Sequence, residues 1–284
     1  MGIAEDTTGS EGWQANLAAL AWQVDMGVDE AIGDAPVNRY DLPEAAKPGS
    51  AAAVPSIPAP APGATDRVYA TPQNQPVSEN LETAIMAARA AAATSETLAD
   101  LRAAMQDFDH CDLKRGARNL VFAGGNPNAR VMIITDAPDV TDDREGRPFA
   151  GQSGDLLDRM FAAIGLSRSD LDPAAAIYIT PALPWRTPQD SEPADADLAM
   201  VRPFLDRHIQ LVNPDVIVLM GNTPLRALLD STGIVRLRGE WRDVANTPAL
   251  PMVHPAHLLR NPTAKRDAWA DLLALQARLR VSGV

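Results

Sequence analysis

The stretch that most constrains the fold of this chain spans residues 130–154, RVMIITDAPDVTDDREGRPFAGQSG. Its four consecutive apolar residues, 131–134, are bounded by turn-forming residues, which is typical of a strand buried inside a parallel sheet. An acidic loop follows, then a Pro-Phe pair flanked by glycines, then a helix predicted over residues 155–164. Ligands of such sheets bind where strands end and loops begin, so we expect a ligand site just after this strand.

Three more apolar runs have the length and boundaries of strands. They cover residues 177–180, 215–221 and 250–253. Predicted helices alternate with them, at 79–106, 195–212 and 263–280. Asn222 and Thr223 are expected to cap a further short helix, and residues 236–241 to form a turn between extended pieces. This alternation predicts an α/β fold, a three-layer α/β/α sandwich around a four-stranded, mainly parallel sheet.

The N-terminal part of the chain differs in character from the rest. A helix is predicted over residues 12–33, because apolar residues recur there on one face: Trp13, Leu17, Leu20, Val24 and Val28. Docking on its own domain and binding a protein partner are both compatible with this pattern. The Pro- and Ala-rich residues 43–78 are predicted to be a disordered linker. We therefore divide the chain into a helical segment (1–42), this linker (43–78) and one α/β domain (79–284).

Charge is distributed unevenly along the chain. The net charge is −12, but residues 1–100 carry 14 acidic and 4 basic residues, whereas residues 236–280 carry 8 basic and 4 acidic ones. A basic face can therefore meet a phosphate backbone although the whole chain is acidic. The single cysteine, Cys111, excludes an internal disulfide. No signal peptide opens the sequence and no apolar run is long enough to span a membrane, so we expect a cytoplasmic monomer.

Six motifs occur in a fixed order between about Leu101 and Leu279. They are LVFAGGNPNARVMIITDAP, DREGRPFAGQSGDLLDRM, IYIT, RPFLDRHIQLVNPDVIVLMG, RLRGEW and HPAHLLRNPTAKRDAW. In this order the sequence resembles the uracil-DNA glycosylase superfamily, and most of all its family 4, whose members usually hold an iron–sulfur cluster. The resemblance implies a base-excision repair enzyme acting on single- or double-stranded DNA. Such an enzyme hydrolyses the bond between uracil and deoxyribose after the base has rotated out of the stack.

The resemblance also implies roles for individual residues. Phe149 matches the phenylalanine that stacks on the base, and His254 matches the histidine that stabilises the developing uracil anion. Asp136 matches the catalytic carboxylate. The other positions matched to substrate binding are Ala137, Pro138 and Pro181. The alternative interpretation of Phe149 is a core phenylalanine, and that of His254 is a structural histidine in a loop.

A loop and helix after His254 match the part of the family that contacts DNA. There an apolar wedge fills the gap left by the flipped base, and basic side chains hold phosphates. The residues predicted to contact DNA are Arg238, Leu258, Leu259, Arg260, Lys265 and Arg266. The alternative for the basic residues is a charged, solvent-exposed helix face.

Three departures from the family pattern bear on activity. The first motif, usually G-E-x-P-G, reads TDAPD from Thr135 to Asp139, so its carboxylate is one methylene shorter and both glycines are lost. Pro181 stands where the family has an asparagine that reads the uracil edge, and proline offers neither a side-chain nor a backbone donor. Acidic residues are also expected to line the mouth of the site: Asp142, Asp143 and Glu145.

Only Cys111 matches one of the four cluster cysteines. The other three fall at or near Phe108, Trp185 and Val201. An iron–sulfur cluster needs thiolates at nearly every corner, so we predict that the cluster is lost and that Cys111 is a buried thiol. His254 and His257 lack further ligands, so no metal site is predicted.

Two functions from different classes remain open from the sequence. The first is a glycosylase that removes uracil or a related base. The second is a weakened or inactive glycosylase fold that binds DNA or a repair partner without cutting. A third, in which residues 1–100 dock on another protein and the fold is a scaffold, has less support.

Overall fold

The computed structural model describes residues 77–281, so the predictions for 1–42 and for 43–76 lie outside the described residues. A six-stranded sheet forms the centre of this part, with the order β1-β3-β2-β4-β6-β5. The strands are β1 (Gly124–Gly125), β2 (Val131–Thr135), β3 (Ile177–Pro181), β4 (Val216–Met220), β5 (Arg242–Val244) and β6 (Thr247–Met252). The four predicted strands are β2, β3, β4 and β6, which pair in parallel.

Two short antiparallel strands, β1 and β5, flank the parallel core. The sequence prediction of four strands missed both. β1 consists of two glycines, and β5 is a three-residue strand with two exposed residues, so neither shows an apolar pattern. All five residues of β2, β3 and β4 are buried, as expected for the middle of a sheet covered on both faces.

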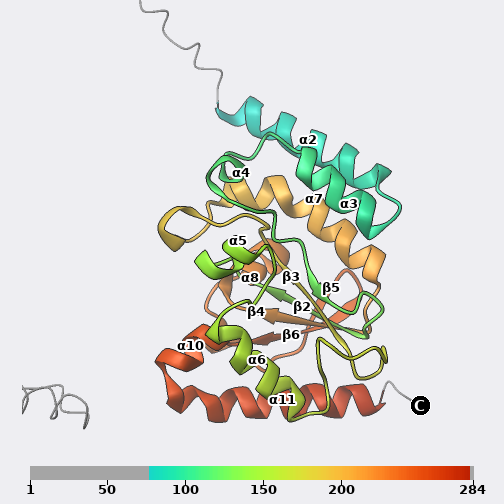
Figure 1. Cartoon of the computed structure of the whole chain (residues 1–284), viewed down its shortest axis with the longest axis vertical. Coiled ribbons are helices and arrows are strands. Elements are labelled where there is room, and N and C mark those ends of the chain that lie inside the picture. The colour runs from blue at the N-terminus through green and yellow to red at the C-terminus, as the bar shows by residue number, and fades with distance from the viewer. Residues whose placement is uncertain (1–76, 282–284) are drawn as a thin grey trace, which may run out of the picture. The chain divides into compact units, whose positions relative to one another are not determined.

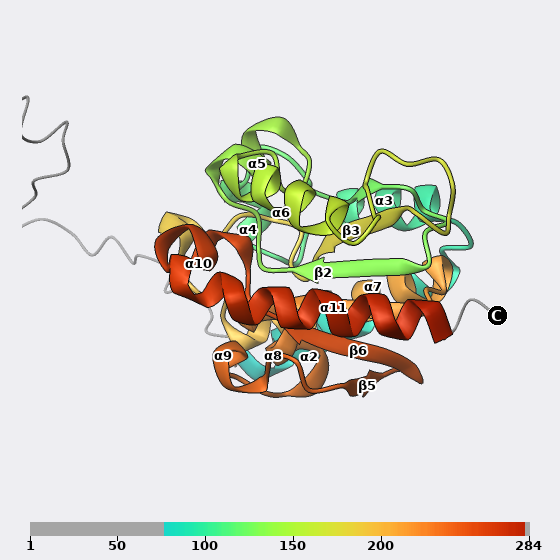
Figure 2. The same ribbon diagram turned by 90° about the horizontal axis from the view of Figure 1, so that it is seen from below.

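Helices cover both faces of the sheet (Figures 1 and 2). On one face lie α7 (Asp195–Val212) and α8 (Asn222–Leu229), with α2 (Val77–Thr94) and α3 (Leu98–Asp107) packed outside α7. On the other lie α6 (Gln152–Ala162) and α11 (Lys265–Val281). The remaining helices are α4 (Leu113–Gly116), α5 (Val140–Glu145), α9 (Ile234–Leu237), α10 (Pro255–Arg260) and the 3-10 turns η1 (Pro188–Asp190) and η2 (Pro262–Ala264). The three-layer sandwich is confirmed.

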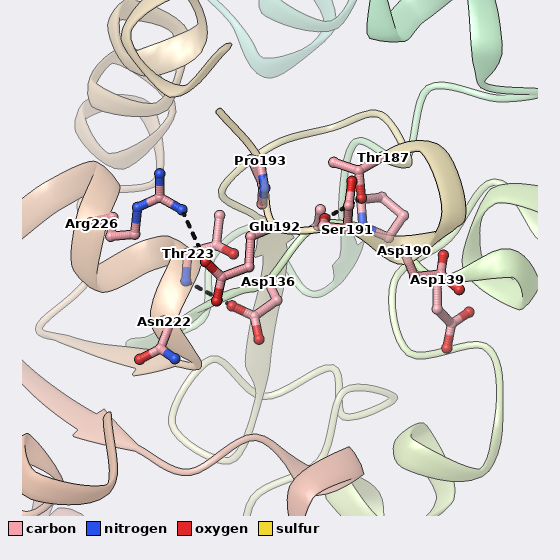
Figure 3. A pocket seen from close by; sticks show the side chains of 12 residues that line it. Asp136, Asp139, Thr187, Asp190, Ser191, Glu192, Pro193, Asn222, Thr223 and Arg226 are labelled. Carbon is pink, nitrogen blue, oxygen red and sulfur yellow. Dashed lines mark hydrogen bonds and ion pairs between the residues drawn. The ribbon is translucent and has the colours of Figure 1, made fainter. Parts of the chain in front are cut away.

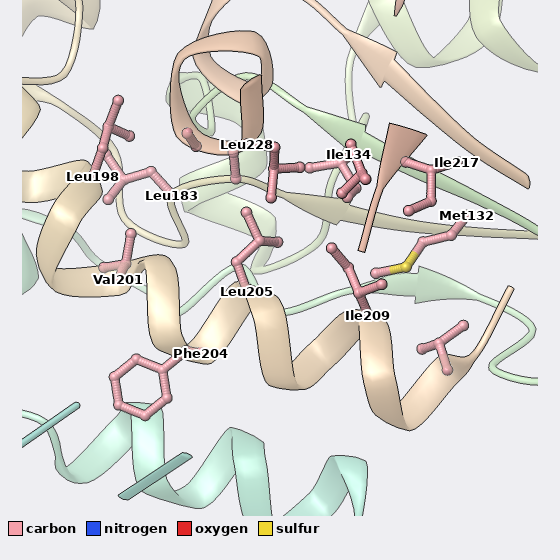
Figure 4. Close-up of a cluster of buried hydrophobic side chains, with 14 of the residues drawn as sticks. Met132, Ile134, Leu183, Leu198, Val201, Phe204, Leu205, Ile209, Ile217 and Leu228 are labelled. Atoms are coloured by element: carbon pink, nitrogen blue, oxygen red, sulfur yellow. The ribbon is translucent and has the colours of Figure 1, made fainter. Parts of the chain in front are cut away.

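Strand side chains alternate between two separate cores. Met132 and Ile134 of β2 pack with α7 and its neighbours (Figure 4). Val131 and Ile133 belong to the opposite core, together with Phe149 and residues of α6 and α11. Thr135, at the carboxyl end of β2, follows Val131 and Ile133 on the same face of the strand.

The helix predicted over residues 79–106 is two helices, and that prediction was wrong. Thr94 and Ser95 bond back to carbonyls of the preceding turn, which ends α2. Thr97 then starts α3 with a capping box, accepting from the Asp100 N–H while the Asp100 carboxylate accepts from the Thr97 N–H. An alanine-rich composition alone does not show such a break.

The segment 236–241 also differs from its prediction as a turn. Residues 236 and 237 close the short helix α9, and the turn comes later, at Gly239 with φ of 76°. Within residues 77–281 no helix is both long and apolar enough to cross a membrane.

Candidate active site

The carboxyl ends of the four parallel strands meet at one edge of the sheet. Their last residues lie side by side in register: Pro181, Thr135, Met220 and Met252. β2 is the first of these strands in the chain, with β3 on one side and β4 on the other, so strand order reverses at its end. Ligands bind at such a switch point in open α/β sheets. The site is built from the segments that leave this edge.

Asp136 directly follows β2 and bonds to the start of α8. Its Oδ1 accepts from the backbone N–H of Thr223 at 2.8 Å (Figure 3). Asn222 and Thr223 were predicted to cap this helix themselves, which is wrong, because the structure gives them no side-chain cap. Gly221 has φ of 112°, and a Cβ there would overlap the Asp136 carboxylate. Glycine is therefore required for this carboxylate to approach the helix end.

Phe149 has a left-handed backbone, with φ of 53°, and its ring is buried. This conformation is unusual for a bulky residue and needs support from its surroundings. The Phe149 carbonyl accepts from Nη1 of Arg168 at 3.1 Å, and Arg168 is held in turn by two bonds to Asp158. Gly154 adds to this support, because a Cβ there would overlap the Phe149 carbonyl oxygen.

His254 leaves the end of β6 and caps α10. Its Nδ1 accepts from the backbone N–H of Ala256 at 3.1 Å, which places the ring proton on Nε2 when the imidazole is neutral. Burial lowers the pKa of His254, and the positive charge of Arg260 lowers it further. The negative charges of Asp136 and Asp139 raise it, but by less. A neutral imidazole with a free Nε2–H donor results.

The structure brings Phe149 and His254 together. Their ring centroids are 5.1 Å apart and their planes meet at 17°, so the rings stack on each other. A base between them would need two van der Waals spacings, about 7 Å in all. The stack is therefore closed, and a base can reach the face of Phe149 only if the His254 ring moves.

The acidic mouth predicted from Asp142, Asp143 and Glu145 is not formed by the first two. The Asp142 carboxylate is buried and accepts from the Ala150 N–H at 2.7 Å, next to Phe149. The Asp143 carboxylate is buried and accepts from two backbone N–H groups of residues 118 and 119. Glu145 is exposed and paired with Arg147. These carboxylates shape the loop that carries Phe149.

Asp139 also has a local partner. Its carboxylate accepts from the backbone N–H groups of Thr141 and Asp142, at 2.7 and 2.9 Å, and so caps α5. The side chain that replaces a family glycine is therefore directed into its own loop.

A cavity of about 200 Å³ lies beside Asp136, between the loop after β3 and the start of α8 (Figure 3). Ala137, Pro138 and Asp139 line it together with Thr187 and residues 190–193. Phe149, His254 and Pro181 do not line it. The cavity therefore does not include the aromatic pair.

The predicted DNA-contact residues fall into two groups. Leu259 is 40% exposed, and Arg260, Lys265 and Arg266 are exposed around the junction of α10 and α11. Leu258 is buried in a core with Leu156, Val253 and Ala268, so the apolar residue available as a wedge is Leu259. Arg238 donates two bonds to the Asp271 carboxylate, which leaves its guanidinium already engaged.

The four positions matched to cluster cysteines lie in one apolar core: Phe108, Cys111, Trp185 and Val201. All four are buried, and Phe108 packs edge-on against Phe204. Burial raises the pKa of the Cys111 thiol to about 11, and the other three positions carry no thiol. Within residues 77–281 no group of three or more His, Cys, Asp or Glu side chains could hold a metal. The residues present do not fit an iron–sulfur cluster.

Comparison with known proteins identifies the family of the chain. A sequence profile of the Uracil DNA glycosylase superfamily matches residues 122–273, and the chain belongs to this superfamily. Its relatives place it in family 4. It is 32% identical to a type-4 uracil-DNA glycosylase of Thermotoga maritima over 154 residues, which cover 53% of this chain and 77% of the relative.

Two archaeal proteins show the same similarity. The identity is 29% over 185 residues to a type-4 uracil-DNA glycosylase of Archaeoglobus fulgidus, covering 62% of this chain and 90% of that protein. It is 30% over 171 residues to one of Sulfurisphaera tokodaii, covering 57% and 75% respectively.

Several residues that support the site were not found from the sequence. Arg168, Asp158 and Gly154 hold the Phe149 backbone, and Gly221 admits the Asp136 carboxylate. The glycines carried a signal, since Gly154 lies in the first turn of α6 and Gly221 directly precedes α8. The Arg168–Asp158 pair carried none, because a ten-residue separation between two charges is common on any surface.

Proposed function

We propose that this protein hydrolyses the N-glycosidic bond of a uracil flipped out of DNA. The observation that carries the proposal is the convergence of Asp136, Phe149 and His254 at the switch point of the sheet. The family relationship supports the same class of reaction. Each of the three side chains has a distinct chemical task.

His254 would stabilise the leaving base. As the bond to the sugar breaks, negative charge builds on a carbonyl oxygen of uracil. The neutral imidazole can donate Nε2–H to that oxygen, because Nδ1 is occupied by the Ala256 N–H. Once the ring has moved off Phe149, a donor held where charge develops lowers the barrier with less reorganisation than water would need.

Asp136 would act on the sugar side. One of its oxygens is fixed by the Thr223 N–H, so the second oxygen has a defined position. A carboxylate there can stabilise positive charge on the sugar or orient the attacking water. The aspartate is shorter than glutamate, and its anchorage at α8 sets how far it reaches.

Phe149 would stack on the base once His254 has swung away. The strained Phe149 backbone and its Arg168 support fix the ring plane, and the incoming base replaces one ring contact by another. Exposed Arg260, Lys265 and Arg266 would bind phosphates, with Leu259 as the wedge.

A single-turnover assay with enzyme in excess tests this proposal. Wild-type protein should convert uracil-containing single- or double-stranded DNA to abasic product. We expect His254→Ala and Asp136→Asn each to lower the rate about 100-fold or more, the range for losing one group that stabilises charge in the transition state. His257→Ala is the matched control, because the only side-chain hydrogen bond of the His257 ring within residues 77–281 is to Asn261. No product from wild type, or equal losses for both histidine variants, would refute the proposal.

A second candidate is a protein that binds DNA without cutting it. Pro181 and the closed Phe149–His254 stack favour it, since the first removes a hydrogen-bonding group and the second covers the base site. A gel shift that depends steeply on salt, without abasic product, is what this candidate predicts.

For cofactor and partners we propose that the protein works without an iron–sulfur cluster and that DNA is its partner. The apolar packing of Phe108, Trp185 and Val201 supports the first point. Colourless purified protein with no bound iron is expected; brown protein containing iron would contradict this.

A further inference from the structure

Thr135 carries the one buried side-chain polar atom without a hydrogen-bond partner in the part of the chain that the structure describes. Its Oγ1 is unpartnered, and the residue is only 4% exposed. Leaving a buried hydroxyl unpaired costs about 1–3 kcal/mol. Such a group in a native fold calls for an explanation, and a missing ligand is one.

The position of Thr135 indicates which ligand is missing. It is the last residue of β2, in register with the last residues of β3 and β4, Pro181 and Met220. Met220 is in register with Met252 of β6. Of these four residues at the ligand-binding edge, only threonine has a side chain that can donate a hydrogen bond.

Strand alternation places the Thr135 side chain on the face where Phe149 lies. Val131 and Ile133, two and four residues earlier, pack in the same core as Phe149. The Thr135 backbone carbonyl is already used, since it accepts from the Ala182 N–H at 2.8 Å. The hydroxyl is therefore a buried polar atom without a partner, on the face of the sheet where the Phe149 ring lies.

We infer that the Thr135 hydroxyl is a base-recognition group, which binds the polar edge of the nucleobase that stacks on Phe149. This inference rests on the proposed function and specifies its substrate contact. A hydroxyl can accept from a ring N–H or donate to a ring carbonyl, so it fits the imide edge of a pyrimidine. Because it rotates freely, it discriminates less sharply among bases than a fixed amide pair does.

Thr135→Val tests the inference, because it removes the hydroxyl and keeps the shape. We expect the variant to bind DNA containing a non-cleavable uracil nucleoside about 10-fold more weakly, and to lose its preference over the same DNA with cytosine, whose edge carries no imide. It should also be more stable than wild type by a few °C, since an unpaired polar atom has been removed. Thr135→Ser, which restores a hydroxyl, should recover the preference.

Two results would overturn the inference. One is a Thr135→Val protein that keeps wild-type preference for uracil. The other is a variant that melts below wild type, which would show that the hydroxyl has a partner inside the protein. Because binding is measured without cleavage, an inactive wild type would refute the proposed function while the preference for uracil still tests Thr135.

Discussion

The loop that carries Phe149 predicts an unusual dependence of stability on pH. Asp142 is buried beneath this loop, where it accepts from the Ala150 N–H. Burial raises the pKa of Asp142 to about 6, against 3.8 for the free side chain, and the backbone bond opposes this only in part. Between pH 4 and 6 the folded state therefore binds more protons than the unfolded chain. Stability contributed by this group is complete below pH 4 and is lost as the pH rises through 6.

The size of the effect follows from the shift. One pKa unit corresponds to 1.36 kcal/mol, so the Asp142 charge destabilises the fold by about 3 kcal/mol above pH 7. In Asp142→Asn the amide oxygen can still accept from Ala150, and no charge is buried. We expect this variant to match wild type near pH 4 and to exceed it by up to about 3 kcal/mol at pH 8.

Urea denaturation of both proteins from pH 4 to 8 measures this difference directly. The difference between variant and wild type isolates Asp142, because all other titrating groups are common to both. Glu82→Gln, which removes a carboxylate at an exposed position on α2, is the control. A difference for Asp142→Asn that does not change with pH, or that falls as the pH rises, would refute the reasoning.

Three further outcomes are expected. Gly221→Ala should lower the free energy of unfolding by about 1–3 kcal/mol, because φ of 112° with ψ of −177° is available essentially to glycine alone. It should also slow base excision by displacing Asp136. Thermal melting and single-turnover rates check this, and an unchanged rate would show that the position of Asp136 does not matter. Arg168→Gln should slow excision about 10-fold, because the Phe149 carbonyl loses its hydrogen-bond donor. Arg130→Gln, which breaks the ion pair of Arg130 with Asp215 elsewhere on the surface, is the control. Equal effects of the two changes would contradict a role for Arg168 in the site. Cys111→Ala should leave uracil excision intact and lower the free energy of unfolding by about 1 kcal/mol, the scale for removing a small buried group. Loss of excision would contradict a purely structural role of Cys111.

The sequence predicted the parts of the fold whose signals are local. β2 and β4 are runs of buried aliphatic residues, and α7 was predicted with its observed limits of 195 and 212. What it missed depends on partners distant in the chain. β1 and β5 pair at the edges of the sheet without an apolar pattern, and the break after Thr94 depends on side chains that bond to the preceding turn.

The candidate site shows the same division. Phe149, Asp136 and His254 could be named from their motifs, because each follows a strand or lies between glycines. Their mutual arrangement could not be named, because the stack of Phe149 on His254 and the bond from Thr223 to Asp136 join segments 87 to 105 residues apart. Asp142 and Asp143 were misjudged for the same reason. An acidic residue in a loop reads as exposed unless the backbone donors that it will meet are known.

The most direct test of the account is a crystal structure of the protein with DNA that carries a non-cleavable deoxyuridine analogue. We expect the flipped base to lie on the ring of Phe149, with the His254 ring displaced from its present stacking position and the Thr135 hydroxyl within hydrogen-bonding distance of the base edge. A base bound elsewhere, with Phe149 and His254 still stacked at about 5.1 Å, would contradict the account.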